Sequence, residues 1–523
     1  MRKKSLIIGL DGAPYHLFSK WFTEKKLLFT GKLIEEGVFG ILETTIPPYT
    51  MIAWPCFYTG KNPAKIGPFL IKSEGFDPEA FSKSHFLSAN EIKTWTIWEY
   101  LSELNYKVGV MNVPVTYPPK KVNGFLISDF LTPKGAIDYT YPPELKDELK
   151  DYKIKSELST GFGFKDKYLD RVKIEKMFYD LLDRRIYYAL KLLKEKNPDF
   201  FIIDFKEFDD FMHFFFDDEN KVYEYFKKID RAIEEMYKIL KPEVILIMSD
   251  HGFHKAPERY FYINRWLELK GLLKRKKTIR GKFSRFLYEA GVLTLKYMSF
   301  VRNFVPERLK FKIAREEMKK RIEWEETKVY ANWYAGLYFN PKFFKNEEEK
   351  RKLAFELKEE LLKLTDEEVN KKPILKAFTK YEIFFGPYFD FMPEVVYTTS
   401  PSYKINVNLT SKVFDRIIER PDIRGHHMGD LEGIYIFNGD GFKRGFKGPK
   451  LSLLDAIPNF LYALHEPLIK DMDGKICEEL FEKNIEKERI KYFDKEYIPY
   501  KVKDLKEEEE ESIKEHLKGL GYL

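Results

Sequence analysis

Short apolar runs recur along the chain, and several of them end in polar or acidic residues. They occupy residues 5–10, 108–113, 125–127, 200–203, 244–248 and 434–437. Continuous apolar runs of this length are typical of strands that are covered on both faces. The pattern therefore predicts a buried sheet.

Segments with helical spacing lie between these strands. Apolar residues recur at helical spacing in 92–104, 174–194 and 222–240. Strands that alternate with helices predict an α/β layered sheet, in which functional groups gather beyond the carboxyl ends of the strands. Asp11 and Asp250 follow two of the strands directly, and Asp209 lies a few residues past a third.

The alternation breaks between about residues 256 and 424. This stretch contains a basic segment, an apolar segment, two short strand patterns and a charged helical pattern, at 270–285, 287–304, 329–331, 337–339 and 346–364. We therefore expect a discontinuous core, residues 1–255 and 425–523, and an inserted cap or substrate domain, residues 256–424. The charge run 507–511 is expected to be a solvated helix face.

Composition narrows the classes of function. Of the 523 residues, 44% are hydrophobic and 33% are charged, as in a globular protein with a large core. The net charge of +7 is weak for this length, so it permits an anionic substrate without requiring a nucleic acid. No apolar run approaches a membrane-spanning length. Glutamine is absent while Lys and Glu abound, which fits a thermophilic source.

The cysteines and the first residues bear on location. Cys56 and Cys477 are too few for a disulfide framework, so we expect a reducing compartment and a cytoplasmic protein. The apolar run 5–10 is too short for a signal peptide and ends at Asp11, so we expect a buried first strand.

Acids and histidines recur in an order that suits a metal site. Asp209 and His213 stand at i and i+4, so on a helix they share one face and can converge on one cation. Asp250 and His251 follow an apolar strand, which places both side chains at the rim of a sheet. Carboxylate and imidazole ligands suit zinc, with manganese or iron as alternatives.

Thr50 is the candidate nucleophile. A neutral threonine hydroxyl is a weak nucleophile, and coordination to a cation lowers its pKa. Asp11 and Asp250 can bind that cation beside Thr50. Two neighbouring cations can stabilise the attacking and leaving oxygens of an in-line displacement. Taken alone, Thr50 is equally well a loop hydroxyl in a turn. The combination predicts a two-metal site that attacks phosphate or sulfate esters.

The chain resembles the type I phosphodiesterase/nucleotide pyrophosphatase group of the alkaline phosphatase superfamily. The resemblance rests on motifs along nearly the whole chain. They are Gly9-Leu10-Asp11-Gly12, Pro48-Tyr49-Thr50, Thr59-Gly60-Lys61-Asn62-Pro63, the Asp209 to His213 spacing, Ser249-Asp250-His251-Gly252 and Gly425-His426-His427, with further likeness at 112–119, 471–474 and 517–522.

The resemblance implies a fold, cofactors and roles. The fold is an alkaline phosphatase-like α/β/α core with a mostly parallel sheet and an inserted α+β cap. The cofactors are two divalent metal ions, zinc with manganese or iron as alternatives. Thr50 attacks phosphorus and forms a phosphothreonine intermediate. One cation is surrounded by Asp11, Thr50, Asp250 and His251, and the other is bound by Asp209, His213 and His427.

Two of these ligand positions have neighbours of the same type. Asp210 adjoins Asp209, but only Asp209 has the family's spacing to His213. His426 is the alternative to His427, which we prefer because the family places its ligand two residues after a glycine, here Gly425.

The chain also departs from the family pattern. Nucleotide pyrophosphatases carry an asparagine that holds a phosphate oxygen, and the matching region, 65–72, contains none. Lys65 or Lys72 can supply positive charge there, although each also reads as a surface lysine. Position 50 is neither cysteine nor serine, which favours phosphodiesters over sulfate esters and phosphomonoesters.

The expected function is therefore hydrolysis of a phosphodiester or pyrophosphate bond. The alternatives are a phosphomonoesterase or mutase-like phosphotransfer enzyme on the same scaffold and a non-catalytic anion-binding relative. The expected partner is a small phosphate ester, namely a nucleotide, a nucleotide sugar or a lipid head group, with no specific nucleic acid. The oligomeric state stays open. The basic segment 274–285 can contact a phosphorylated polymer or an anionic membrane, but a solvated cap face is the favoured interpretation.

Overall fold

The computed structural model describes residues 2–67, 88–154, 170–276, 321–332, 336–417, 423–485, 488, 490–506 and 508–513. Its core is a ten-stranded sheet with the order β18-β2-β17-β7-β1-β6-β3-β4-β5, in which β19 also pairs with β2. In that order the strands span Phe446–Lys447, Val38–Glu43, Glu432–Gly439, Val244–Met248, Ser5–Gly9, Phe200–Asp204, Val108–Met111, Gly124–Ile127 and Thr140–Tyr141, and β19 spans Leu451–Ser452.

The centre of this sheet is parallel. Strands β7, β1, β6, β3 and β4 pair in parallel, whereas β17 runs antiparallel to both β2 and β7. Each predicted strand is present, with boundaries that differ by a few residues, and β2 is an additional strand that the apolar runs did not predict. The predicted α/β class with a mostly parallel sheet is thus confirmed.

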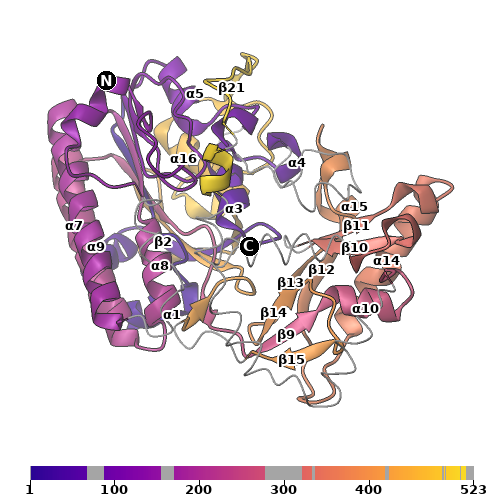
Figure 1. Ribbon diagram of the computed structural model, residues 1–523. Helices are drawn as coiled ribbons and strands as arrows, with labels where there is room; N and C mark the ends of the chain where they lie inside the picture. The colour runs from indigo at the N-terminus through magenta and orange to yellow at the C-terminus, as the bar shows by residue number, and fades with distance from the viewer. Residues whose placement is uncertain are drawn as a thin grey trace.

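Helices cover both faces of the sheet, because alternate strand residues enter two separate apolar clusters. Ile7 belongs to one cluster, whereas Leu6 and Ile8 belong to the other. The first cluster packs under α3 (Thr50–Thr59), α4 (Pro63–Ile66), α5 (Ile97–Glu103) and α16 (Ala456–Leu464). The second packs under α1 (Tyr15–Thr23), α2 (Phe29–Glu35), α7 (Arg171–Lys196), α8 (Lys206–Phe215) and α9 (Glu219–Leu240) (Figure 1).

Helix boundaries follow local capping. The predicted helix 92–104 begins only at Ile97, because the Thr96 side chain accepts a hydrogen bond from the Glu99 amide and caps the helix there. The residues before it contain a short 3-10 helix, Ala89–Glu91. The predicted helices at 174–194 and 222–240 are each extended by a few residues.

The described residues between 256 and 424 form two smaller sheets, outside the ten-stranded one (Figure 1). The first has the order β14-β9-β15 and the second β10-β11-β13-β12. Their strands and helices are β9 (Arg259–Tyr262), α10 (Ile263–Leu269), β10 (Val329–Asn332), β11 (Gly336–Phe339), α14 (Glu347–Lys363), β12 (Ile374–Thr379), α15 (Lys380–Ile383), β13 (Val395–Thr399), β14 (Tyr403–Asn406) and β15 (Phe414–Arg416).

Strands β8 (His254–Lys255) and β16 (Gly425–His426) pair antiparallel at the two ends of the stretch 256–424. The remaining short elements are β20 (Leu468–Ile469), β21 (Tyr492–Phe493) and 3-10 helices at Pro143–Glu148, Trp324–Glu326, Pro341–Phe343, Phe389–Phe391, Leu453–Asp455 and Glu478–Leu480. The division into core and cap stays a prediction.

The four-stranded sheet and α15 contact the core at the end of β2 and at the start of α4. Lys376 Nζ pairs with Glu43 Oε1 at 2.6 Å, and Asn62 Nδ2 donates to the Ile383 carbonyl at 2.8 Å. The motif around Asn62 also binds the motif at 471–474, since Lys61 pairs with Asp471 and the Asn62 amide donates to Asp473 Oδ2 at 2.8 Å. Two distant segments of the resemblance therefore fix one loop at the end of α3.

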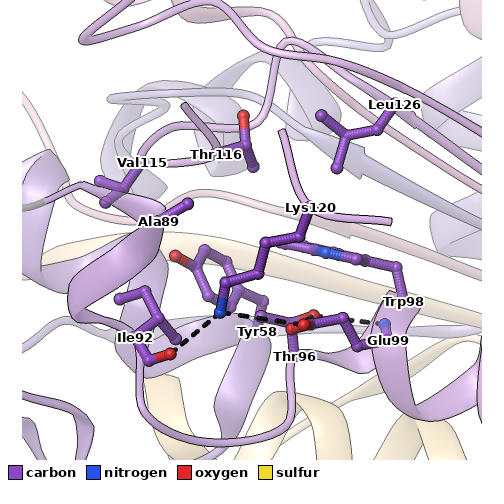
Figure 2. Close-up of a pocket in the computed structure, with 10 residues that line it drawn as sticks. All are labelled: Tyr58, Ala89, Ile92, Thr96, Trp98, Glu99, Val115, Thr116, Lys120 and Leu126. Carbon is purple, nitrogen blue, oxygen red and sulfur yellow. Dashed lines mark hydrogen bonds and ion pairs between the residues drawn. The ribbon is translucent and has the colours of Figure 1, made fainter. Parts of the chain in front are cut away.

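A buried lysine lies in a small pocket away from the predicted site residues (Figure 2). Lys120 Nζ donates to the Ile92 carbonyl at 3.0 Å and to the Tyr497 hydroxyl at 2.7 Å, and it lies 3.8 Å from Glu99 Oε1. Only 4% of its surface is exposed. Lys120 is therefore a buried ammonium group that lies outside the candidate site.

Several sequence predictions fall outside the described residues. These are Lys72, most of the basic segment 270–285, the apolar segment 287–304, residue 507 of the charge run and the motif 517–522. Lys65 is described, and it pairs with Asp473. Within the described ranges, no helix is both long and apolar enough to cross a bilayer.

Candidate metal centre

Two neighbouring parallel strands deliver the first pair of acids. Gly9 at the end of β1 is in register with Met248 at the end of β7, so Asp11 and Asp250 lie two residues beyond equivalent positions. Both carboxylates are fully buried. The turn after Asp11 needs the positive φ of 73° at Gly12, whose amide donates to Asp250 Oδ1 at 3.3 Å. The strand register thus places the two carboxylates side by side.

Helix α8 supplies the second predicted pair. Asp209 and His213 lie one turn apart on α8, and His213 Nε2 is 3.6 Å from Asp209 Oδ2. His213 Nδ1 donates to the Gly425 carbonyl at 2.8 Å. That bond fixes the tautomer and leaves Nε2 as the ligand-competent nitrogen facing Asp209. The prediction that these two residues share a helix face is confirmed.

His251 lies at the middle of the centre. Its Nδ1 donates to the Gly252 carbonyl at 3.0 Å. Its Nε2 lies 3.5 Å from Asp11 Oδ1 and 3.4 Å from Asp250 Oδ2. The same Nε2 is 3.2 Å from Thr50 Oγ1. Thr50 is the first residue of α3 and is fully buried. Its hydroxyl therefore lies inside the centre, next to His251 and the two acids.

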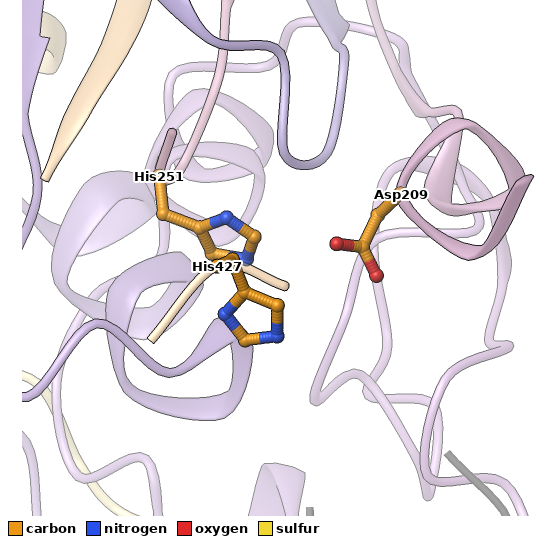
Figure 3. A group of neighbouring side chains, drawn as sticks. All are labelled: Asp209, His251 and His427. Atoms are coloured by element: carbon orange, nitrogen blue, oxygen red, sulfur yellow. The ribbon is translucent and has the colours of Figure 1, made fainter. Parts of the chain in front are cut away.

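His427 completes the centre from the segment that follows β16. Its ring lies parallel to that of His251, with centroids 4.1 Å apart and an interplanar angle of 13°. Figure 3 shows Asp209, His251 and His427 on three separate segments, with the carboxylate of Asp209 facing the two rings. With Asp11 and Thr50, five distant parts of the chain therefore meet at one place.

Two groups of side chains have ligand atoms that all lie within 4.8 Å of one another. One contains Asp11, Asp250 and His251, and the other contains Asp209, His251 and His427. The first matches the predicted first cation site, with Thr50 beside it. The second contains His251 where we predicted His213, which lies next to Asp209. The assignment of each ligand to a cation stays a prediction.

The two alternative residues lie outside both groups. His426 uses its Nδ1 to accept the Met428 amide at 3.0 Å. Its ring centroid is 6.0 Å from that of His213. Asp210 likewise belongs to neither group. The geometry thus favours His427 and Asp209.

Burial disfavours the ionised form of these acids unless a positive charge lies nearby. Burial, reinforced by the charge of Asp250, raises the pKa of Asp11 to about 7. Burial also raises the pKa of Asp250. The pKa of Asp209 instead falls, because Lys206, His213 and His251 outweigh its burial. Several buried carboxylates that lie this close together indicate a cation-binding site, because a bound cation would stabilise their ionised forms.

The donor atoms fit a divalent transition metal. Within the described part of the chain, Asp209 Oδ1, Asp250 Oδ2 and His213 Nε2 are buried and have no hydrogen-bond partner. Buried polar atoms are normally paired, so three such acceptors in one centre indicate a cation. Burial lowers the pKa of His213, and burial with the charge of His251 lowers that of His427, so both rings are in the neutral form that binds metal. Mixed oxygen and nitrogen donors suit zinc, manganese or iron.

Sequence reasoning missed two buried residues of the centre, Trp54 and Lys206. Trp54 Nε1 donates to Asp11 Oδ2 at 3.1 Å. Lys206 Nζ contacts Asp11 and Asp209. Only the sequence spacing could have indicated these two residues. Trp54 follows Thr50 by one helical turn, and Lys206 precedes Asp209 by three residues.

We expect Trp54→Phe to weaken divalent-cation binding by about tenfold, because the indole hydrogen bond orients the carboxylate of Asp11. Titration calorimetry of the cation-free protein measures the change. Trp21→Phe is the matched control, since Trp21 Nε1 donates to Glu219 Oε1 at 3.2 Å outside the centre. Equal affinities for the Trp54 variant and the unaltered protein would show that the indole does not position Asp11.

Known proteins resemble this chain mainly in fold. No curated protein sequence matches it. The solved structure of human ectonucleotide pyrophosphatase/phosphodiesterase 5 is 12% identical, with a TM-score of 0.51, over 92% of this chain and 100% of that one. Phosphonoacetate hydrolase from Sinorhizobium meliloti 1021, in complex with phosphonoformate, is 13% identical, with a TM-score of 0.54, over 88% of this chain and 95% of that one. These similarities show an alkaline phosphatase-like fold.

The family is shown by sequence. The profile described as type I phosphodiesterase/nucleotide pyrophosphatase matches residues 5–430, which include every predicted ligand and Thr50. The matched region contains both buried groups of acids and histidines. The chain therefore belongs to the type I phosphodiesterase/nucleotide pyrophosphatase family and is a phosphoric ester hydrolase of that family.

Proposed function

We propose that the protein is a two-cation hydrolase that cleaves phosphodiester or pyrophosphate bonds with Thr50 as the nucleophile. The observation that carries this proposal is the 3.2 Å distance from Thr50 Oγ1 to His251 Nε2. His251 is the side chain that both ligand groups share. A hydroxyl next to the shared ligand lies within reach of a phosphate bound between the two groups.

The position of Thr50 on its helix supports a role in phosphate chemistry. Thr50 begins the ten-residue helix α3, and Tyr49 before it is extended. Backbone amides and the positive end of the dipole at a helix start favour negative charge. The side chain is also fully buried, so water is largely excluded from the attacking oxygen.

The chemistry divides between the cations and the chain. When bound, divalent cations supply a lower pKa for the Thr50 hydroxyl and positive charge for the phosphate oxygens. Thr50 Oγ1 attacks phosphorus, the bond from phosphorus to the leaving group breaks, and a phosphothreonine forms. Water then attacks the same phosphorus, which releases the phosphate product and restores the Thr50 hydroxyl. Asp11 and Asp250 each have a carboxylate oxygen within 3.5 Å of His251 Nε2. Their negative charges therefore lie beside the attacking oxygen, where they balance the positive charge of a bound cation.

We assign residues 256–424 to a cap that shapes the substrate pocket. The antiparallel pair β8–β16 joins the two ends of this range, and its helix α15 contacts the loop after α3 through the Ile383 carbonyl. A cap in this place would select the leaving group, which we expect to belong to a nucleotide, a nucleotide sugar or a lipid head group. Zinc is the preferred cation because histidine and carboxylate are among its common ligands.

A pair of reporter substrates tests the reaction class. We expect kcat/KM for bis-p-nitrophenyl phosphate to exceed that for p-nitrophenyl phosphate by at least about tenfold, equivalent to about 1.4 kcal/mol of transition-state stabilisation. Absorbance of released p-nitrophenol at saturating zinc or manganese gives both constants. A preference for the monoester would instead support a phosphomonoesterase or a mutase-like enzyme. Absence of turnover in a cation-loaded protein would support an anion-binding relative.

A further inference from the structure

Lys206 places a fixed positive charge inside the candidate metal centre. It is the first residue of α8 and is fully buried. Its ammonium group lies 3.1 Å from Asp11 Oδ1, pairs with Asp209 Oδ2 and lies 3.8 Å from Asp210 Oδ1. A buried lysine normally loses its proton or is paired with acids, and this one is paired with acids from two different elements.

The oxygens that Lys206 contacts are those that face the histidines. Asp11 Oδ1 is also the atom 3.5 Å from His251 Nε2. Asp209 Oδ2 is also the atom 3.6 Å from His213 Nε2. A divalent cation bound between a carboxylate and a histidine would therefore share an oxygen with the ammonium group. Because both carry positive charge, lysine and cation oppose each other at short range.

The carboxylates do not depend on Lys206 alone for their position. Asp11 Oδ2 accepts from Trp54 Nε1 at 3.1 Å, and Asp250 Oδ1 accepts from the Gly12 amide at 3.3 Å. Asp209 is the exception, because α8 fixes its backbone while Lys206 donates to its Oδ2. Removing the ammonium group thus removes a positive charge while the hydrogen bonds that position Asp11 and Asp250 remain. Charge decides the effect on cation binding.

We propose that Lys206 is a built-in counter-cation of this centre, which offsets part of the negative charge of both cation sites in the cation-free protein and competes with divalent cations for the same oxygens. This inference rests on the proposed two-cation function. In this role Lys206 contacts the ligand carboxylates and not the reacting atoms, so it is not a catalytic residue. The lysine lowers the affinity of the centre for divalent cations. It also stabilises the folded centre before cations bind.

The test compares Lys206→Met with the unaltered protein. Methionine keeps an unbranched apolar stem and removes the charge. We expect zinc and manganese to bind the cation-free variant at least about tenfold more tightly, and we expect its melting temperature without cations to fall. Titration calorimetry with a competing chelator gives the affinity, and thermal unfolding with and without cations gives the stability.

Lys120→Met is the matched control. Lys120 is also buried and lies beside Glu99, but outside the centre (Figure 2). Its loss should lower the melting temperature and leave cation affinity unchanged. Lys206→Arg keeps the charge and should bind cations as the unaltered protein does. If the cation-free Lys206→Met protein does not fold, the cation-loaded form should release its cations to a chelator more slowly than the unaltered protein.

Three results would overturn the proposal. Unchanged or weaker cation binding by Lys206→Met would show that the lysine does not compete with cations. Unchanged cation binding together with a lost inhibition by inorganic phosphate would make Lys206 a phosphate ligand instead. An unaltered protein that binds no divalent cation would remove the two-cation function itself, which distinguishes that failure from a failure of the lysine proposal alone.

Discussion

Thr50→Val is expected to lower kcat for bis-p-nitrophenyl phosphate by at least about 10³-fold while the protein stays folded and keeps its cations. Valine has nearly the shape of threonine and carries a methyl group where threonine has its hydroxyl. The hydroxyl lies 3.2 Å from His251 Nε2 and is the nucleophile that we propose. Without it no phosphothreonine can form. Steady-state kinetics, cation content and thermal unfolding of the variant measure the three parts of this expectation.

The same helix offers a matched control at its other end. Thr59 is fully buried and donates its hydroxyl to the Pro55 carbonyl at 2.6 Å. Thr59→Val removes a buried hydroxyl of the same type from α3, so it should cost stability but little kcat. Thr50→Ser keeps an attacking oxygen and should retain measurable turnover. A Thr50→Val protein with near-native kcat would remove threonine from the mechanism.

Trapping the intermediate separates nucleophile from ligand. A threonine that only binds a cation would lower kcat when replaced, but it would never carry phosphate. Acid quenching of the unaltered protein during turnover, followed by mass spectrometry, should find phosphate on the peptide that contains Thr50. Phosphate on another residue, or on none under conditions where hydrolysis of the intermediate is slow, would contradict the proposed route.

The strands and the order of the acids could be predicted because their signals are local. The runs before Asp11 and Asp250 are continuous and apolar, as strands covered on both faces require, and the structure buries every residue of β1 and β7. Two residues one turn apart on a helix necessarily share a face, which placed Asp209 beside His213.

The sharing of His251 could not be predicted, because it depends on how separate segments pack. Its ring stacks on that of His427 at 4.1 Å, and this contact joins the segment after β7 to the segment after β16. Spacing along the chain carries no information about such a distance. The family resemblance divided the ligands between two cations, whereas the geometry gives His251 a place in both groups.

The close packing around β1 also escaped sequence reasoning. A Cβ added to Gly9 would lie 2.3 Å from the ring of Trp54, so only glycine permits the indole to reach Asp11. Lys206 escaped for a different reason. A lysine near acids in a sequence usually marks a solvated surface, and only the fold reveals that this one is fully buried.

Removal of divalent cations is expected to abolish turnover, and zinc or manganese should restore it. The reason is that three buried acceptor atoms of the centre have no hydrogen-bond partner among the described residues, while a threonine hydroxyl needs a cation to ionise. Activity after exhaustive dialysis against a chelator, and after stepwise return of each metal, measures this. Rates that are indifferent to chelation would contradict the two-cation scheme.

Paired histidine variants locate the ligand. We expect His427→Ala to weaken cation binding by at least about 100-fold and to lose turnover accordingly. His427 groups with Asp209 and His251, whereas the neighbouring His426 accepts the Met428 amide through Nδ1 at 3.0 Å. His426→Ala should therefore keep most of the cation affinity and serves as the control, measured by calorimetry and by metal content. The reverse result would move the ligand to His426, and cation binding that survives both substitutions would leave the second site to Asp209, His213 and His251.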